Sequence, residues 1–181
     1  MSLTYRFINA LRLALISLTD PAPFILGGVR ARIYRVAGAK VGAGACVFGR
    51  SMVTYPDRLQ IGRRTFVNVG CTFENLENIS IGDDSFIGPN VGFFTSNHDL
   101  RTLSLVCRPV IVGSRVWIGG GCKLLPGCEI ADNSIIAAGT VMLGRSYKAG
   151  VYGGVPGRLL NVCSSKVLVT DGRDADLGDG N

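Results

Sequence analysis

The sequence predicts an all-β protein: a parallel β-helix of about five three-sided coils, with an N-terminal helix and a short C-terminal extension. An apolar residue recurs every six positions through the middle of the chain, and a small or β-branched residue often stands two positions before it. Glycine makes up 25 of the 181 residues. Such hexads suit short strands joined by tight turns, and three hexads make one coil of a stacked core.

Residues 1–40 precede the repeats and contain one clear helix candidate, Thr4–Leu18, which Asp20-Pro21 ends. Its apolar residues share one face: Phe7, Ile8, Leu11, Ala14, Leu15 and Leu18. Arg6 and Arg12 interrupt the apolar run, which is therefore too short to span a bilayer. The apolar face can touch a membrane surface or pack against the rest of the protein, and the second interpretation is favoured.

The hexads begin at Val41 and lie in a domain that we place at 41–163. The downstream markers are six positions apart: Val112, Ile118, Leu124, Ile130, Ile136 and Met142. The upstream markers form three triplets: Val41, Val47 and Val53; Ile61, Val67 and Phe73; Ile81, Ile87 and Phe93. Every longer interval follows the third hexad of a coil, so all insertions leave from one corner. The longest interval, between Phe93 and Val112, predicts an inserted loop at about 94–110.

Cysteine usage and charge bear on location and ligands. Cys71, Cys122 and Cys128 occupy the small inward position, which favours core packing over reactivity. The six cysteines show no C-x-x-C spacing, which indicates reduced thiols and predicts a cytoplasmic protein. The net charge of +6 suits an anionic ligand, while the polar, acidic residues 164–181 predict a flexible tail. Nucleic acid is not an expected partner, because interleaved basic and aromatic residues are absent.

Four segments resemble motifs of the hexapeptide-repeat acyltransferases: IGPNV at 87–91, SNHD at 96–99, VWIGGG at 116–121 and GVPGR at 154–158. They are typical of the galactoside and maltose O-acetyltransferases and of those of surface-polysaccharide biosynthesis. The resemblance implies a left-handed β-helix, a homotrimer with sites between subunits, and acetyl-CoA as acyl donor. A single histidine cannot build a zinc site of several imidazoles, so no metal is expected.

His98 is the candidate catalytic residue, because the only histidine of the chain lies in the longest insertion and in a family motif. A sugar hydroxyl is too weak an acid to attack a thioester unaided, and an imidazole can take its proton as general base. The resemblance assigns Asn90 and Trp117 to acceptor binding. An ordinary turn residue and an outward tryptophan at a subunit contact are the alternative interpretations.

Gly120, Ala138 and Arg158 are the candidate contacts for coenzyme A. Gly120 and Ala138 are 18 positions apart, so in a coil of three hexads they stack and leave a shallow lane for an extended ligand. A tight turn that tolerates no bulk is the alternative. Arg158 corresponds to a family arginine near the CoA phosphates, or is a solvated surface residue. Where the family often has Thr-Lys after the last hexads, this chain has Leu143-Gly144.

The sequence therefore predicts an acetyl-CoA-dependent O-acetyltransferase that acts by direct transfer on a hydroxyl of a sugar or glycan precursor. One alternative is N-acetylation of an amino-sugar nucleotide with the same base and donor. The other is a non-catalytic β-helix that serves as an assembly subunit. Release of the CoA thiol from acetyl-CoA with a panel of sugars discriminates catalysis from assembly.

Overall fold

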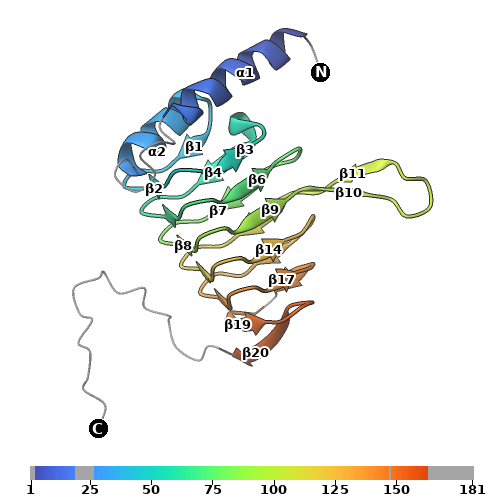
Figure 1. Ribbon diagram of the computed structural model, residues 1–181. Coiled ribbons are helices and arrows are strands. Elements are labelled where there is room, and N and C mark those ends of the chain that lie inside the picture. The colour runs from blue at the N-terminus through green and yellow to red at the C-terminus, as the bar shows by residue number, and fades with distance from the viewer. Residues whose placement is uncertain (1–2, 19–26, 147, 163–181) are drawn as a thin grey trace.

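The computed structural model describes residues 3–18, 27–146 and 148–162, and these form a rod of stacked coils with two helices at one end (Figure 1). The predicted tail at 164–181 and the predicted helix stop at Asp20-Pro21 lie outside the described residues. Neither of the two helices in the described ranges has the length and apolarity needed to cross a membrane.

Three parallel sheets form the sides of the rod. Side A consists of β1 (Lys40–Val41), β4 (Leu59–Ile61), β7 (Ile79–Ile81), β12 (Val110–Val112), β15 (Glu129–Ile130) and β18 (Arg145–Ser146). Side B consists of β2 (Cys46–Val47), β5 (Phe66–Val67), β8 (Phe86–Ile87), β13 (Trp117–Ile118), β16 (Ile135–Ile136) and β19 (Gly150–Gly153), with β20 (Arg158–Val162) antiparallel to β19. Side C consists of β3 (Met52–Val53), β6 (Thr72–Glu74), β9 (Gly92–Phe94), β14 (Lys123–Leu124) and β17 (Val141–Met142).

The register confirms the six-residue period. On side A, Ile61 pairs with Ile81, which pairs with Val112, so the markers of successive coils lie directly over one another. On side C the rings of Phe73 and Phe93 stack with centroids 5.1 Å apart. The small residues before the markers are buried as well: Ala45, Ser51, Thr65, Cys71, Ser85, Val91, Val116, Cys122, Cys128, Ser134 and Thr140. Aliphatic columns with small residues between them therefore fill the rod.

Part of a sixth coil extends the predicted five. Ser146 of β18 pairs with Ile130, and Tyr152 of β19 pairs with Ile136. The step from the inward Met142 to the inward Ser146 is four residues instead of six, and Ser146 is not apolar. A search for apolar hexads therefore ends one coil too early.

Two helices, α1 (Leu3–Ser17) and α2 (Gly27–Val36), cap the first coil, and α2 packs on β1 and β2. The sequence predicted α1 but not α2. As expected, α1 packs against the rest of the protein, but it does so through Leu13 and Ile16. The predicted contact face is wrong, because Phe7 and Leu11 are exposed. Polar contacts on the inward face explain this orientation, as described below.

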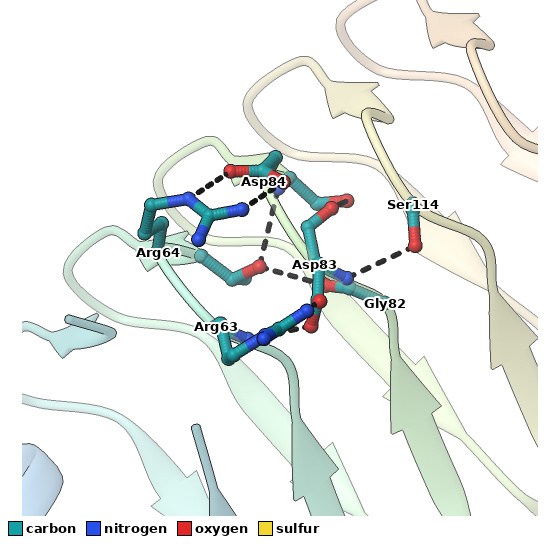
Figure 2. A network of polar contacts seen from close by, with 8 residues as sticks. Arg63, Arg64, Gly82, Asp83, Asp84 and Ser114 are labelled. Carbon is teal, nitrogen blue, oxygen red and sulfur yellow. Dashed lines mark hydrogen bonds and ion pairs between the residues drawn. The ribbon is translucent and has the colours of Figure 1, made fainter. Parts of the chain in front are cut away.

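Charged side chains bridge successive coils at the corner between sides A and B (Figure 2). Arg63 Nε lies 3.0 Å from Asp83 Oδ2, and Arg64 Nε lies 2.5 Å from Asp84 Oδ1. The Ser114 hydroxyl, one coil further, accepts a 3.1 Å hydrogen bond from the Asp83 amide. Hydrogen bonds from the Arg63 amide and the Arg64 guanidinium lower the pKa of Asp83 and Asp84, respectively. Both arginines are largely exposed, so these pairs align the coils more than they stabilise them.

Candidate active site

The longest insertion is a β-hairpin that projects far from the rod (Figure 1). Its strands β10 (Ser96–His98) and β11 (Leu105–Cys107) are antiparallel, with Ser96 opposite Cys107 and His98 opposite Leu105. The hairpin leaves side C after β9 and returns to side A at β12. It therefore occupies the corner between sides C and A, where the shorter insertions also lie.

Glu74, the last residue of β6, fixes the base of this hairpin. Its carboxylate accepts hydrogen bonds from the Thr95 amide at 3.2 Å, the Ser96 amide at 3.4 Å and the Ser96 hydroxyl at 3.0 Å. The buried Thr95 hydroxyl donates to the Glu74 carbonyl at 2.9 Å. The strand that carries His98 is thus tied to the preceding coil two residues before the imidazole.

The tip of the hairpin is ordered by Asp99. Asp99 Oδ1 accepts hydrogen bonds from the amides of Arg101 at 2.8 Å and Thr102 at 2.9 Å. These bonds, the one from Thr102 first, lower the pKa of Asp99. The carboxylate next to His98 in sequence therefore shapes the tip, and within the described part of the chain no hydrogen bond joins it to the imidazole.

Two adjoining clefts flank the hairpin base. The exposed His98 lines a cleft of about 220 Å³, whose wall is made by Asn97, His98, Asp99, Val106, Arg108 and Pro126. A second cleft of about 500 Å³ shares Asn97 and Pro126 with it and reaches Glu74. Glu74 and Arg108 were not predicted as cleft residues from the sequence. The position of Glu74 directly before an inter-coil insertion is the signal that could have identified it.

Asn90, Gly120 and Ala138 lie at the other edge of side C, at its corner with side B. Because Ile118 pairs with Ile136, Gly120 lies over Ala138 two residues later, as the 18-residue spacing predicts. The Gly139 amide donates to the Gly120 carbonyl at 2.9 Å, which holds this stack. Asn90 belongs to the same corner one coil earlier, is exposed, and has a left-handed backbone with φ of 57°.

This edge is open to a ligand. A Cβ atom added at Gly121 or Gly139 would meet no other atom within 4 Å, and Ala138 is exposed. The Arg158 backbone pairs with Gly153, and Gly154 continues the column below Ala138, because Ile136 pairs with Tyr152. A path without bulky side chains therefore leads down the corner towards an exposed arginine.

Trp117 points outward from β13 on side B, with 49% of its surface exposed. Its strand neighbours are Phe86 and Ile135, so it stands in a row of outward apolar residues. The structure thus brings five of the six candidates to side B or to its edge with side C, whereas His98 lies apart. His98 follows Asn90 by eight residues across side C, a span of at most about 29 Å.

The buried thiols do not offer a nucleophile. Burial raises the pKa of Cys71 to about 11 and that of Cys128 to about 12, which disfavours the thiolate. Among the residues that the structure describes, no cluster of three or more His, Cys, Asp or Glu side chains could hold a metal ion. Of the titratable side chains at the hairpin clefts, Glu74 and Asp99 accept hydrogen bonds from the hairpin backbone, and His98 is exposed.

The repeats match those of known transferases. A family model described as bacterial transferase hexapeptide (six repeats) matches residues 109–144. Galactoside O-acetyltransferase of Escherichia coli is 31% identical over 127 residues, which cover 67% of this chain and 63% of that enzyme. The chain carries a hexapeptide-repeat transferase domain. It spans less than two thirds of the length of the first curated relatives that it matches.

Solved structures of family members have the same fold. A maltose O-acetyltransferase from Clostridium difficile 630 superposes with a TM-score of 0.83 at 27% identity, over 91% of this chain and 90% of that one. A galactoside acetyltransferase in complex with coenzyme A gives a TM-score of 0.81 at 26% identity, over 90% of this chain and 84% of the other. The left-handed β-helix that the resemblance implied is the fold of this chain.

Proposed function

We propose that the protein is an acetyl-CoA-dependent O-acetyltransferase that acts on a hydroxyl of a sugar or glycan precursor, with His98 as general base. The observation that carries the proposal is the exposed imidazole of His98 in a cleft of about 220 Å³ on a hairpin whose base is fixed by Glu74. Relatives support the reaction class: they include a galactoside O-acetyltransferase, and a galactoside acetyltransferase has been solved with coenzyme A.

The reaction follows from the chemistry of His98. The imidazole takes the proton of the acceptor hydroxyl while the hydroxyl oxygen bonds to the thioester carbonyl carbon. The tetrahedral species then collapses, the carbon–sulfur bond breaks, and the imidazolium returns the proton to the departing thiolate. No acyl-enzyme is required. Arg108 adds a cation to the wall of the same cleft, where it can stabilise the negative charge that develops on the carbonyl oxygen.

The open edge is the proposed donor site. An extended pantetheine arm fits a path that has Gly120 and Ala138 on its floor and no side-chain bulk at Gly121 and Gly139. Arg158 stands at the end of this path, where a guanidinium can pair with a phosphate. Asn90 and Trp117, on the adjoining coils, are the proposed acceptor contacts.

We further propose a homotrimer in which each site forms between two chains. The donor edge and His98 lie at opposite edges of side C, so one chain does not bring them together. The outward row of side B is apolar: Cys46, Phe66, Phe86, Trp117, Ile135 and Val151. The outward row of side A is mainly polar: Lys40, Gln60, Ser80, Ile111, Glu129 and Arg145. The row is half-buried except for the exposed Trp117. An outward apolar row of this length is typical of a subunit interface, which would join the donor edge of one chain to the hairpin of the next.

The test is His98→Ala, with Leu100→Ala on the same hairpin as the matched control. With a panel of sugars that includes amino sugars, His98→Ala should release CoA thiol about 10²- to 10⁴-fold more slowly, the usual effect of one positioned base. Its affinity for acetyl-CoA should be unchanged, because the imidazole acts on the proton of the acceptor hydroxyl and not on the donor. Leu100→Ala should retain the wild-type rate. A folded His98→Ala variant with near-normal turnover would refute the general-base assignment.

A further inference from the structure

The outward face of α1 is apolar although the helix lies at the surface. Four residues form this outer stripe: Phe7, Ile8, Leu11 and Leu18, the last one position beyond the helix. Phe7 is 66% exposed, Leu11 is 57% exposed and Leu18 is 76% exposed. At 3.6 residues per turn the stripe covers roughly 100° of the helix, the width of a core-facing stripe. A surface helix normally turns such a face inward, so the stripe indicates contact with another apolar phase.

Specific polar contacts hold the helix in this orientation. The Tyr5 hydroxyl donates to Asp57 Oδ2 at 3.0 Å, and the Asn9 amide group donates to the Thr54 carbonyl at 2.9 Å. Arg12 Nη1 lies 3.5 Å from Asp57 Oδ1 on the same inward face. Rolling α1 to bury the stripe would break all three contacts and expose Ile16 to solvent. The exposure of the stripe is thus built into the fold.

The end of the rod that carries α1 is basic, and this charge favours an anionic partner. Residues 1–40 carry six basic side chains and one acidic one, and α1 and α2 contain only basic charges. Arg6 of α1 and Arg32 of α2 are exposed, and Lys40 follows at the start of β1. A second copy meeting this face would oppose like charges, which disfavours self-association. A surface that combines acyl chains with anionic headgroups complements both the stripe and the cations.

The position of the helices in the fold is compatible with docking on such a lipid surface. Figure 1 shows α1 lying across the end of the rod, beyond β1 and β2, while the hairpin projects sideways from the middle. The end of the rod can therefore rest on a flat surface without covering His98. With α1 only 15 residues long, the fitting position is in the plane of the surface.

We propose that α1 docks the protein on an anionic phospholipid bilayer, with Phe7, Leu11 and Leu18 among the outer acyl segments and Arg6 and Arg32 at the headgroups. The juxtaposition of an outward apolar stripe with a purely basic pair of helices carries this inference. It does not depend on acetyl transfer, and binding is measured without any acceptor or donor.

The experiment is flotation of the full chain with vesicles of phosphatidylcholine alone and with an equal mixture of phosphatidylcholine and phosphatidylglycerol. We expect binding to the mixed vesicles, weaker binding to the neutral ones, and loss of binding as salt is raised. Phe7→Gln/Leu11→Gln keeps good helix formers and should weaken binding on the order of a hundredfold. Leu160→Gln, an exposed leucine in β20 at the other end of the rod, is the matched control and should bind like wild type.

Three outcomes would overturn the proposal. Wild-type protein that does not float with the anionic vesicles refutes the docking surface. Equal binding by the double variant and the wild type refutes the stripe as the contact. A double variant that is smaller than wild type by light scattering assigns the stripe to a contact between copies. Because circular dichroism checks the fold of each variant, loss of structure cannot be mistaken for loss of binding.

Discussion

Gly62→Ala should destabilise the rod by forcing two coils apart. A Cβ atom built at Gly62 would lie 2.4 Å from the carbonyl carbon of Gly82 and 2.5 Å from the amide nitrogen of Asp83. Both are backbone atoms of the next coil, and they cannot rotate away as a side chain can. The hydrogen bond from the Gly62 amide to the Ile81 carbonyl, 2.8 Å long, holds the coils at this spacing. Relief of the clash therefore has to stretch the ladder itself.

Overpacking of a well-packed core costs about 1–3 kcal/mol, and a clash with backbone lies at the upper end of that range. For a chain of this size, about 3 kcal/mol corresponds to a Tm lower by about 6–12 °C. Thermal melts followed by circular dichroism at one protein concentration measure the shift. The matched control is Gly28→Ala in α2, where the added methyl meets no atom within 4 Å and should raise the stability of the helix. A Gly62→Ala variant that melts within about 2 °C of wild type would refute the close-approach argument.

Four further results are expected. Ala138→Phe should raise KM for acetyl-CoA at least about tenfold at unchanged Tm, since the side chain is exposed on the proposed lane; an unchanged KM removes the lane from this edge. Glu74→Ala should lower kcat about tenfold and leave KM for acetyl-CoA unaltered, because it removes the carboxylate that accepts the hairpin's three hydrogen bonds; unaltered kcat contradicts a positioning role. Iodoacetamide at mildly alkaline pH should leave Cys71 and Cys128 unmodified in the folded protein, because burial raises their thiol pKa to about 11 and about 12, as peptide mapping by mass spectrometry would check. Asp84, whose pKa is lowered in the folded state, stabilises fully above its unfolded pKa and loses this contribution as pH falls through the folded value, so Asp84→Asn should show a slightly smaller acid-induced drop in Tm; an identical drop argues against the linkage.

The coils could be predicted from the sequence because their determinants are local. Each inward marker and its preceding small residue recur at a fixed distance, and parallel stacking places Ile118 over Ile136 without any long-range choice. The 18-residue offset of Gly120 and Ala138 gave their stacking for the same reason. The insertion after Phe93 was visible as a broken interval, but its hairpin pairing depends on Ser96 meeting Cys107 and could not be read from periodicity.

The face of α1 that meets the rod could not be predicted, because it is set by contacts across more than forty residues of chain. Asp57, in the turn between β3 and β4, accepts a hydrogen bond from the Tyr5 hydroxyl and forms an ion pair with Arg12. The spacing of apolar residues does not reveal such pairs. The contribution of Glu74 to the hairpin base was hidden in the same way. It acts through hydrogen bonds to residue 96, in the next coil. The orientation of α1 and the role of Glu74 depend on non-local polar contacts, and these could not be predicted from the sequence.

A stack of parallel coils has no intrinsic length, because its terminal coil exposes unpaired backbone groups that could template another coil or another molecule. Here α2 packs over β1 and β2 at one end. At the other end β20 folds back antiparallel on β19, with a register shift between Val151 and Tyr152 that breaks the pattern a further coil would need. The two caps thus terminate what would otherwise be an open-ended filament. Whole coils could be added or removed between unchanged caps, which would lengthen or shorten the open edge that carries Gly120 and Ala138 in fixed increments while leaving the ends protected.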